Sequence, residues 1–256
     1  MKQLLNKWLK NSHLLKIDYL KQLIFKPNCL LCAQNIAQNN ENTHPSIHAV
    51  CRACVEELPW HPKTSCPQCG LASSGMVCGS CLNSPPDFDA TKAVFLYAYP
   101  VDAMMLRYKY GKNLNLGDTF GEFLAEKVDI ESIDLIIPMP MHPQRLKERG
   151  FNQALEIAKV LSKILTKNAR EKLDYKSVIR QTLTPPQASL PLKERVKNIK
   201  GAFKANADLT GKRIAIVDDV MTTGASLNEL TKTLKKAGAS HVECWVIART
   251  LPHQSS

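Results

Sequence analysis

From residue 90 onward, hydrophobic residues alternate between short runs typical of strands and spacings typical of helices. The short apolar runs predict strands at residues 93–99, 133–138, 175–179, 213–217 and 241–247. Apolar positions at helical spacing predict helices at residues 101–110, 118–128, 151–165 and 225–238. Because strands that alternate with helices build parallel sheets covered on both faces, we expect one α/β domain over residues 90–250.

The chain before residue 90 follows a different pattern. Residues 1–26 interleave leucines with lysines and predict an amphipathic arm that packs on the main domain, with a membrane-surface helix as the alternative. Residues 27–84 contain few apolar runs and cannot bury a sizeable core unaided. Pro85 and Pro86 predict an extended linker between this segment and the α/β domain.

The hydrophobic pattern also bears on location. No apolar run approaches the roughly 20 residues that a membrane-spanning helix needs. Residues 1–25 show no apolar core followed by a small-residue cleavage site, which a secretory signal would have. We therefore expect a cytoplasmic protein with no stable membrane insertion.

Cysteines supply the first candidate chemistry. Eight of the nine form four Cys-x-x-Cys pairs, namely Cys29 with Cys32, Cys51 with Cys54, Cys66 with Cys69, and Cys78 with Cys81. Eighteen residues separate the first two pairs and eight the last two, a spacing typical of two zinc ribbons over residues 27–84. Two structural zinc ions are predicted, and they would supply the folding energy that this segment lacks.

Two points about the cysteines stay open. Pairing in sequence order is the simplest arrangement, and a crossed arrangement of alternate pairs is the alternative. A disulfide framework is disfavoured because a chain of this length rarely needs one. The ninth cysteine, Cys244, lies in an apolar run and is expected in the core.

A strand that leads into two carboxylates and a small-residue turn is the strongest candidate for a ligand site. Open α/β sheets bind ligands at the carboxyl ends of their strands. The turn opens a helix whose unpaired N–H groups and dipole suit a phosphate, and Gly224 lets the backbone come close. The sequence therefore predicts a sugar-phosphate site formed by Asp218, Asp219, Val220, Met221, Thr222, Thr223, Gly224, Ala225 and Ser226. The alternative is an ordinary helix cap and loop.

Basic residues gather after the strand expected at 133–138. Arg145, Lys147 and Arg149 can neutralise a polyanion, and arginine can bind phosphate oxygens in pairs. The whole chain carries a net charge of +11, and residues 145–200 hold 14 basic side chains against 5 acidic ones. Such an excess suits the phosphates of a small ligand, a nucleic-acid backbone or both, while a solvated basic face is the alternative.

A long connection follows the strand expected at 175–179. Residues 180–200 include three prolines and exceed an ordinary connection in length, which favours a functional loop over a disordered insertion. Candidate contacts there are Arg180, Thr182, Gln187 and Arg195. Residues 109–112 are a further candidate, for a substrate hood, although a helix end explains them as well.

Residues 214–226 resemble the 5-phosphoribosyl 1-pyrophosphate (PRPP) loop of type I phosphoribosyltransferases. Together with residues 138–153, residues 180–187 and the cysteine pairs, they resemble the ComF family of competence-associated, phosphoribosyltransferase-like proteins. The resemblance implies a type I phosphoribosyltransferase-like sheet, mainly parallel with helices on both faces, plus a small zinc-ribbon module. It also implies that Asp218 and Asp219 hold the ribose hydroxyls, that residues 222–226 wrap the 5′-phosphate, and that magnesium accompanies PRPP.

The same resemblance implies a pyrophosphate site and a flap that closes over PRPP. Its candidate residues are His142, Arg145, Arg149, Arg180 and Arg195. The implied role is handling of DNA during natural transformation, with single-stranded DNA as a partner. Two alternatives are a metabolic enzyme similar to amidophosphoribosyltransferases and a non-catalytic PRPP sensor that docks a competence helicase. Whether PRPP is turned over would separate these readings, and the sequence does not name an acceptor nucleophile.

Overall fold

The structure, a computed structural model, describes residues 28–36, 50–111, 114–165, 172–183 and 199–251. The chain divides into two compact units, residues 1–57 and 58–256. The arm expected at residues 1–26 lies outside the described residues. In the smaller unit the described secondary structure includes the short helix α2 (Arg52–Glu56).

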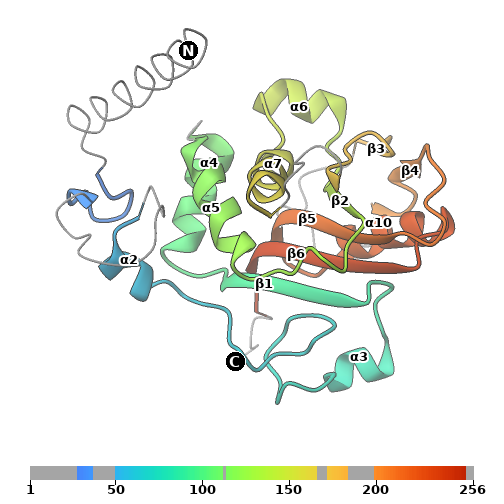
Figure 1. The fold of residues 1–256 in the computed structure, drawn as a ribbon, viewed down its shortest axis with the longest axis horizontal. Helices are drawn as coiled ribbons and strands as arrows, with labels where there is room; N and C mark the ends of the chain where they lie inside the picture. The colour runs from blue at the N-terminus through green and yellow to red at the C-terminus, as the bar shows by residue number, and fades with distance from the viewer. Residues whose placement is uncertain (1–27, 37–49, 112–113, 166–171, 184–198, 252–256) are drawn as a thin grey trace, which may run out of the picture. The chain divides into compact units, whose positions relative to one another are not determined.

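A four-stranded sheet lies at the centre of the larger unit (Figure 1). Its strands are β1 (Ala90–Leu96), β2 (Leu135–Pro138), β5 (Arg213–Met221) and β6 (His241–Arg249). They lie in the order β1-β6-β5-β2, and every neighbouring pair is parallel. The two central strands, β5 and β6, are buried over most of their length, as strands covered on both faces should be.

Helices cover both faces of this sheet. They are α4 (Val101–Tyr110), α5 (Asn115–Ala125), α6 (Pro143–Arg149), α7 (Gln153–Leu165) and α10 (Ala225–Lys236), with a short α3 (Gly79–Asn83) before β1. The buried face of α10 shares one core cluster with Ile216 and Cys244 of the central strands. Trp245, the next residue on β6, must face the other side, because successive side chains of a strand alternate. On that side α5 and α7 lie together (Figure 1).

The predicted fold class is confirmed, and so is the burial of Cys244. Helix α4 begins and ends where the pattern predicts, whereas β1 begins and ends earlier. Strand β5 continues past residue 217 to Met221, because its pairing with β6 continues through the two acids. A hairpin of β3 (Val178–Arg180) and β4 (Phe203–Ala205) frames the long connection, and β4 was not predicted.

Helix α6 was also not predicted from the sequence. It has only seven residues, too few for an apolar periodicity to show. Its limits follow from local chemistry, since His142 Nδ1 accepts a hydrogen bond from the Gln144 N–H at 3.2 Å and Gly150 ends the helix with a φ of +88°.

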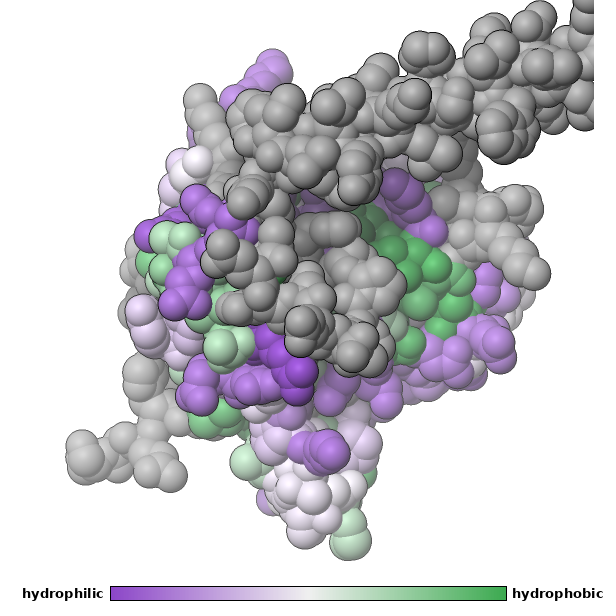
Figure 2. Space-filling model, turned by 60° about the vertical axis from the view of Figure 1, so that its left-hand side comes forward, coloured by the Kyte–Doolittle hydropathy of each residue, from purple (hydrophilic) through white to green (hydrophobic). Residues whose placement is uncertain are grey.

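The surface is mixed in character. One face shows a group of hydrophobic residues beside hydrophilic ones (Figure 2). Large apolar side chains that are exposed in the described residues include Leu106, Tyr110 and Leu114. Exposed apolar residues of this kind are normal on a protein surface and assign no partner. Within the described ranges, no helix is both long enough and apolar enough to cross a membrane.

Candidate functional site

The predicted sugar-phosphate site is a turn between a central strand and a helix. β5 ends at Met221 and α10 begins at Ala225. Gly224 caps the helix with a φ of +78°, and a Cβ at this position would lie 2.8 Å from Met221 Cε. The left-handed backbone therefore favours glycine, whereas the contact could be relieved by a shift of the flexible Met221 side chain. The backbone N–H groups at the start of α10 form the kind of site that binds a phosphate.

The two acids before this turn are successive residues near the carboxyl end of β5, where open α/β sheets bind ligands. Asp219 Oδ2 forms an ion pair of 2.9 Å with Lys109 Nζ of α4. Asp218 Oδ1 accepts the Asp219 N–H at 2.9 Å, and Asp219 Oδ1 accepts the Val220 N–H at 2.6 Å. The turn thus carries two oriented carboxylates, and one of them is already paired with a cation.

The two carboxylates differ in their electrostatics. Burial, and then the charge of Asp219, raises the pKa of Asp218 to about 7, against the opposing effect of Lys109 and Arg180. Burial opposes the charge of Lys109 as well, but the carboxylate of Asp219 outweighs it and raises the pKa of the lysine. The site therefore holds a charged Lys109–Asp219 pair beside an acid that titrates near neutral pH.

This arrangement predicts a pH-dependent cost in stability. The pKa of Asp218 is raised in the folded protein from an unfolded value of about 4, so the folded state loses stability as pH rises from about 4 to about 7. Asp218→Asn should remove that loss. Relative to wild type, the variant should gain on the order of 2 kcal/mol between pH 4 and pH 8, roughly half the full conversion of the shift. Urea unfolding at both pH values measures this, and parallel profiles would contradict it.

Basic residues expected at the pyrophosphate position lie on neighbouring elements. Burial, and then the charge of Arg145, lowers the pKa of Arg180, while Asp218 acts on it in the opposite sense. Arg149 Nη1 donates to Gln153 Oε1 at 2.9 Å, and the guanidinium lies 5.6 Å from the ring centroid of Tyr110.

His142 and Arg195 are the other two residues predicted for the pyrophosphate site and flap. His142 acts as the cap of α6, so its Nδ1 has a structural role. Arg195 lies outside the described residues, as does Gln187 of the expected flap. The described parts of that connection reach residue 183 on one side and begin again at residue 199 on the other.

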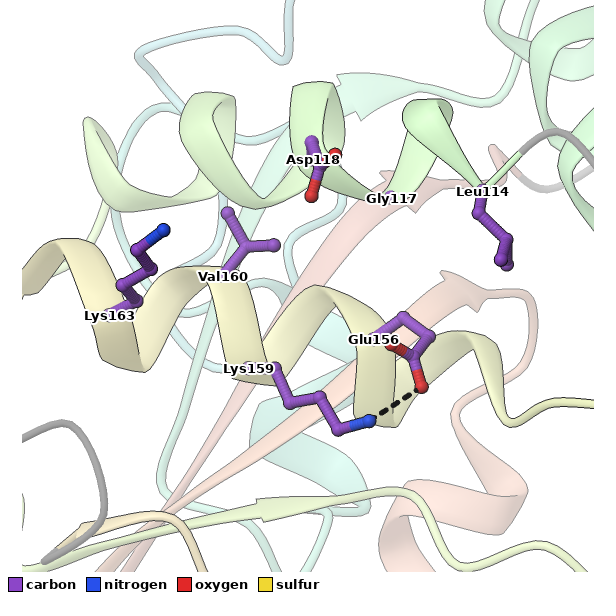
Figure 3. A pocket seen from close by; sticks show the side chains of 7 residues that line it. All are labelled: Leu114, Gly117, Asp118, Glu156, Lys159, Val160 and Lys163. Carbon is purple, nitrogen blue, oxygen red and sulfur yellow. Dashed lines mark hydrogen bonds and ion pairs between the residues drawn. The ribbon is translucent and has the colours of Figure 1, made fainter. Parts of the chain in front are cut away.

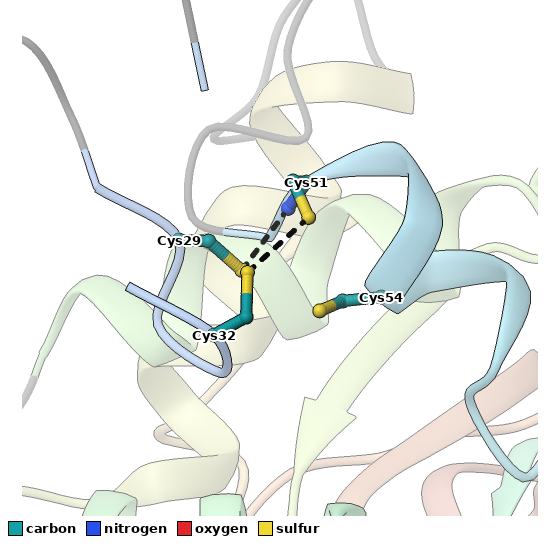
Figure 4. A group of neighbouring side chains, drawn as sticks. All are labelled: Cys29, Cys32, Cys51 and Cys54. Carbon is teal, nitrogen blue, oxygen red and sulfur yellow. Dashed lines mark hydrogen bonds between the residues drawn. The ribbon is translucent and has the colours of Figure 1, made fainter. Parts of the chain in front are cut away.

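Two groups of four cysteines could each hold a metal ion, and they follow the sequence order of the pairs. Within each group all sulfur atoms lie within 4.8 Å of one another. In the first group they come from a turn and from α2 and its cap, and they point toward one another (Figure 4). The groups are Cys29, Cys32, Cys51 and Cys54, and Cys66, Cys69, Cys78 and Cys81.

The sulfur spacing fits tetrahedral zinc. Four thiolates about 2.3 Å from one ion would lie about 3.8 Å from each other. The Sγ atoms of Cys32 and Cys51 are 3.6 Å apart, and those of Cys69 and Cys78 are 3.7 Å apart. A disulfide bond would require about 2.05 Å, and all nine cysteines are free. When bound, each ion would crosslink two chain segments.

Each group also contains one cysteine whose pKa is lowered, so that its thiol loses a proton more readily. Burial opposes the charge of Cys29 and Cys66, but backbone N–H groups outweigh it and lower the pKa of each to about 6. These donors include the N–H of Cys51, 3.3 Å from Cys29 Sγ, and the N–H of Cys78, 3.3 Å from Cys66 Sγ. The thiolate is the form that binds a metal, so these backbone N–H groups favour metal binding even before an ion is present.

The second cysteine group is hydrogen-bonded to the sheet. The N–H of Thr91 on β1 donates to Pro67 O at 2.9 Å, and its hydroxyl donates to Gln68 O at 2.6 Å. His61 Nε2 bonds to Gly70 O at 2.7 Å. This group therefore belongs to the unit of residues 58–256, whereas the first group belongs to the unit of residues 1–57.

Two residues near the turn were not foreseen in their actual roles. The sequence predicted Lys109 only as part of a substrate hood, but its amino group forms an ion pair with Asp219. Arg249 was not marked at all, and it lies at the end of β6 with 4% of its surface exposed. An arginine that ends a long apolar strand was the available signal, because burying its charge requires several acceptors.

A hollow lies between α5 and α7. In Figure 3 the amino group of Lys159 reaches Glu156, with which it forms an ion pair of 2.9 Å. None of the lining residues belongs to β5 or α10, and the hollow balances two lysines against two acids. It therefore assigns no ligand. The lining residues are Leu114, Gly117, Asp118, Glu156, Lys159, Val160 and Lys163.

Comparison with known proteins agrees with this architecture. Residues 147–254 match the model of the phosphoribosyl transferase domain. DNA utilization protein YhgH of Escherichia coli is 31% identical over 232 residues, which are 87% of this chain and 97% of that protein. Competence protein F of Haemophilus influenzae is 29% identical over 238 residues, 88% of this chain and 98% of that protein.

A more distant relative extends the match to another group of bacteria. Competence protein ComFC of Streptococcus pneumoniae is 24% identical over 230 residues, 86% of this chain and 99% of that protein. The relatives are thus matched over nearly their whole length. This chain belongs to the ComF family of competence-associated proteins with a phosphoribosyltransferase domain.

Proposed function

We propose that the protein binds PRPP with magnesium at the turn between β5 and α10 and acts in the handling of DNA during uptake. One observation carries the first part. Two oriented carboxylates, Asp218 and Asp219, precede a glycine-capped helix start inside the segment that matches the phosphoribosyltransferase domain. The names of the relatives support the second part, since they refer to competence and to DNA utilization.

The proposed binding mode uses each group for one part of the ligand. The carboxylates would accept hydrogen bonds from the ribose hydroxyls, and the N–H groups at the start of α10 would donate to the 5′-phosphate. Arg145 and Arg180 would face the pyrophosphate. Lys109 would either stay with Asp219 or turn to a phosphate. Magnesium would neutralise part of the pyrophosphate charge and favour its departure.

If the protein is an enzyme, the bond from C1 of the ribose to the pyrophosphate oxygen breaks as a nucleophile donates its electron pair to C1. Pyrophosphate leaves with the bonding electrons. The residues described would act by positioning the ligand and by balancing the charge that develops on the leaving group.

Titration calorimetry tests the proposal directly. The full-length protein with magnesium should bind PRPP, and ribose 5-phosphate should bind more weakly because it lacks the pyrophosphate. Product analysis of the same mixtures then distinguishes an enzyme from a non-catalytic PRPP sensor. Release of pyrophosphate with an added acceptor would identify an enzyme, whereas binding without turnover would favour a sensor that docks a competence helicase. Failure to bind PRPP at millimolar concentration would refute the assignment.

Contact with single-stranded DNA is the second proposed function, and the partners of individual basic residues bear on which of them could take part. Lys159 is paired with Glu156, and Lys172 Nζ donates to the carbonyls of Ile130 and Ile133 at 2.9 and 2.6 Å. Part of the basic excess is therefore used within the fold. Lys147 on α6 is exposed, and we test it together with Arg145 of the same helix as a candidate contact to a nucleic-acid backbone.

Charge reversal tests the DNA proposal. Single-stranded DNA should bind with little sequence preference, and affinity should fall steeply with salt. Arg145→Glu with Lys147→Glu should weaken binding at least tenfold and flatten the salt dependence. Lys159→Glu with Lys163→Glu, the same change on α7, should weaken it much less. Fluorescence anisotropy at low salt measures all three proteins, and equal affinities for the two variants would contradict a site on α6.

A further inference from the structure

The buried Arg249 contacts two parts of the molecule that are far apart in sequence. Its Nε donates to the carbonyl of Cys69 in the second cysteine group at 2.9 Å. Its Nη1 donates to the carbonyls of Met221 at 3.1 Å, Thr222, and Thr250 at 2.8 Å. Burial lowers the pKa of this guanidinium, and neighbouring thiols oppose that effect. One side chain therefore joins a cysteine group to the first residues of the phosphate turn.

The geometry of the peptide bond gives these contacts a direction. In a trans peptide the C=O and the following N–H point opposite ways. Among the described residues the one cis bond precedes Pro100, so the peptides after Met221 and Thr222 are trans. Because their carbonyls point toward Arg249, the N–H groups of Thr222 and Thr223 point away from it.

The charge of Arg249 also makes the N–H groups on the far side of these peptides better donors. A cation that binds a peptide carbonyl polarises the peptide and strengthens its N–H as a donor. A buried guanidinium can thus favour an anion on the far side of the turn without touching it. The N–H of Thr250 also donates to Met221 O at 3.0 Å, which holds the same peptide from the end of β6.

The connection continues through the cysteine group. Cys69 precedes Gly70, which has a φ of +70° and whose carbonyl forms a hydrogen bond with His61. An added Cβ on Gly70 would approach Thr91 at 3.2 Å and the Cδ of Arg249 at 3.8 Å. The cysteine turn thus packs directly on the arginine stem, so the position of the Cys69 carbonyl depends on how the four sulfur atoms are held.

We infer that Arg249 is a positioning residue for the phosphate turn and that metal at the second cysteine group supports it, while metal at the first group does not. This inference rests on the proposed function only for its ligand. The predicted order of the turn can be measured without any ligand. Arg249 therefore differs from Arg145 and Arg180, which are expected to face the pyrophosphate themselves.

Hydrogen exchange of the ligand-free, zinc-loaded protein is the first test. In Arg249→Met the amides of Asn228 and Thr250, which bond to Gly224 O and Met221 O, should exchange at least tenfold faster than in wild type. Arg249→Lys keeps one charged donor and should lie between the two. Arg213→Met is the matched control, because that side chain is exposed and donates to Ser132 O at the opposite end of β5.

The cysteine variants test the role of the metal. Cys78→Ser should speed exchange at the same two amides, and Cys54→Ser should leave them at the wild-type rate. These two variants keep the inference testable if Arg249→Met does not fold. Unchanged exchange in both Arg249 variants, or equal effects of the two cysteine variants, would overturn the inference.

Calorimetry with PRPP completes the experiment at a temperature where circular dichroism shows each variant folded. Arg249→Met should weaken PRPP binding at least tenfold, although the residue does not contact the ligand. A residue that only supports the fold would lower the melting temperature and leave this affinity unchanged, which would contradict the inference. If the wild type itself does not bind PRPP, the proposed function fails, while the exchange result still decides the role of Arg249.

Discussion

Freshly reduced protein is expected to contain two zinc ions per chain, measured by mass spectrometry of the metal. The sulfur spacing of both cysteine groups fits tetrahedral zinc. Zinc binding to four thiolates is worth about 10–16 kcal/mol, which is comparable to the whole stability of a domain. Removing the second ion by Cys66→Ser should therefore destabilise the larger unit by at least ~3 kcal/mol in denaturant unfolding.

Double variants check the grouping of the cysteines. Cys29→Ser with Cys54→Ser affects one group and should cost one ion. Cys29→Ser with Cys66→Ser affects both groups and should cost two. The opposite counts would show a crossed arrangement, and zinc content near zero in the wild type would refute a metal role altogether.

Replacing both acids of the turn is expected to have the largest effect on ligand binding. Asp218→Asn with Asp219→Asn keeps the side-chain shapes but removes both charged acceptors for the ribose hydroxyls. PRPP affinity should fall at least ~30-fold, which corresponds to about 2 kcal/mol and is typical of hydrogen bonds to charged groups. Titration calorimetry with magnesium present measures the change.

The controls for this variant separate binding from folding. Asp129→Asn changes an exposed acid whose Oδ1 accepts only from the local backbone of Glu131, and it should bind PRPP as the wild type does. Lys109→Met removes the partner of Asp219 and tests whether the ion pair competes with the ligand. An Asp218 and Asp219 double variant that is folded and binds PRPP with wild-type affinity would exclude the turn as the ribose site.

Local patterns predicted much of this molecule. The apolar run before Asp218 and the small residues around Gly224 each act over a few positions, so strand, turn and helix start follow from neighbours in sequence. The spacing of the Cys-x-x-Cys pairs likewise indicated two groups. The C-terminal end of β5 was not predicted, because the run of hydrophobic residues ends at Val217, whereas backbone pairing with β6 continues to Met221.

Contacts between distant residues could not be predicted in this way. The partner of Asp219 is Lys109 on α4, and nothing in the pattern around either residue names the other. The choice between sequential and crossed cysteine pairs has the same character, because both satisfy the spacing. The helix-cap role of His142 could not be predicted, because it depends on α6, which is too short to show a periodicity, while its place at the pyrophosphate stays a prediction.

The division of the chain at residue 57 has a consequence for how such proteins can vary. The two cysteine modules have similar sequence patterns, but their attachments differ. Residues 1–57 form their own compact unit. The module around Cys69 shares hydrogen bonds with Thr91 and Arg249, so its loss would expose an edge of β1 and leave a buried guanidinium without its acceptor. The second module and the sheet are therefore expected to vary together, because a change in one alters the hydrogen-bond partners of the other.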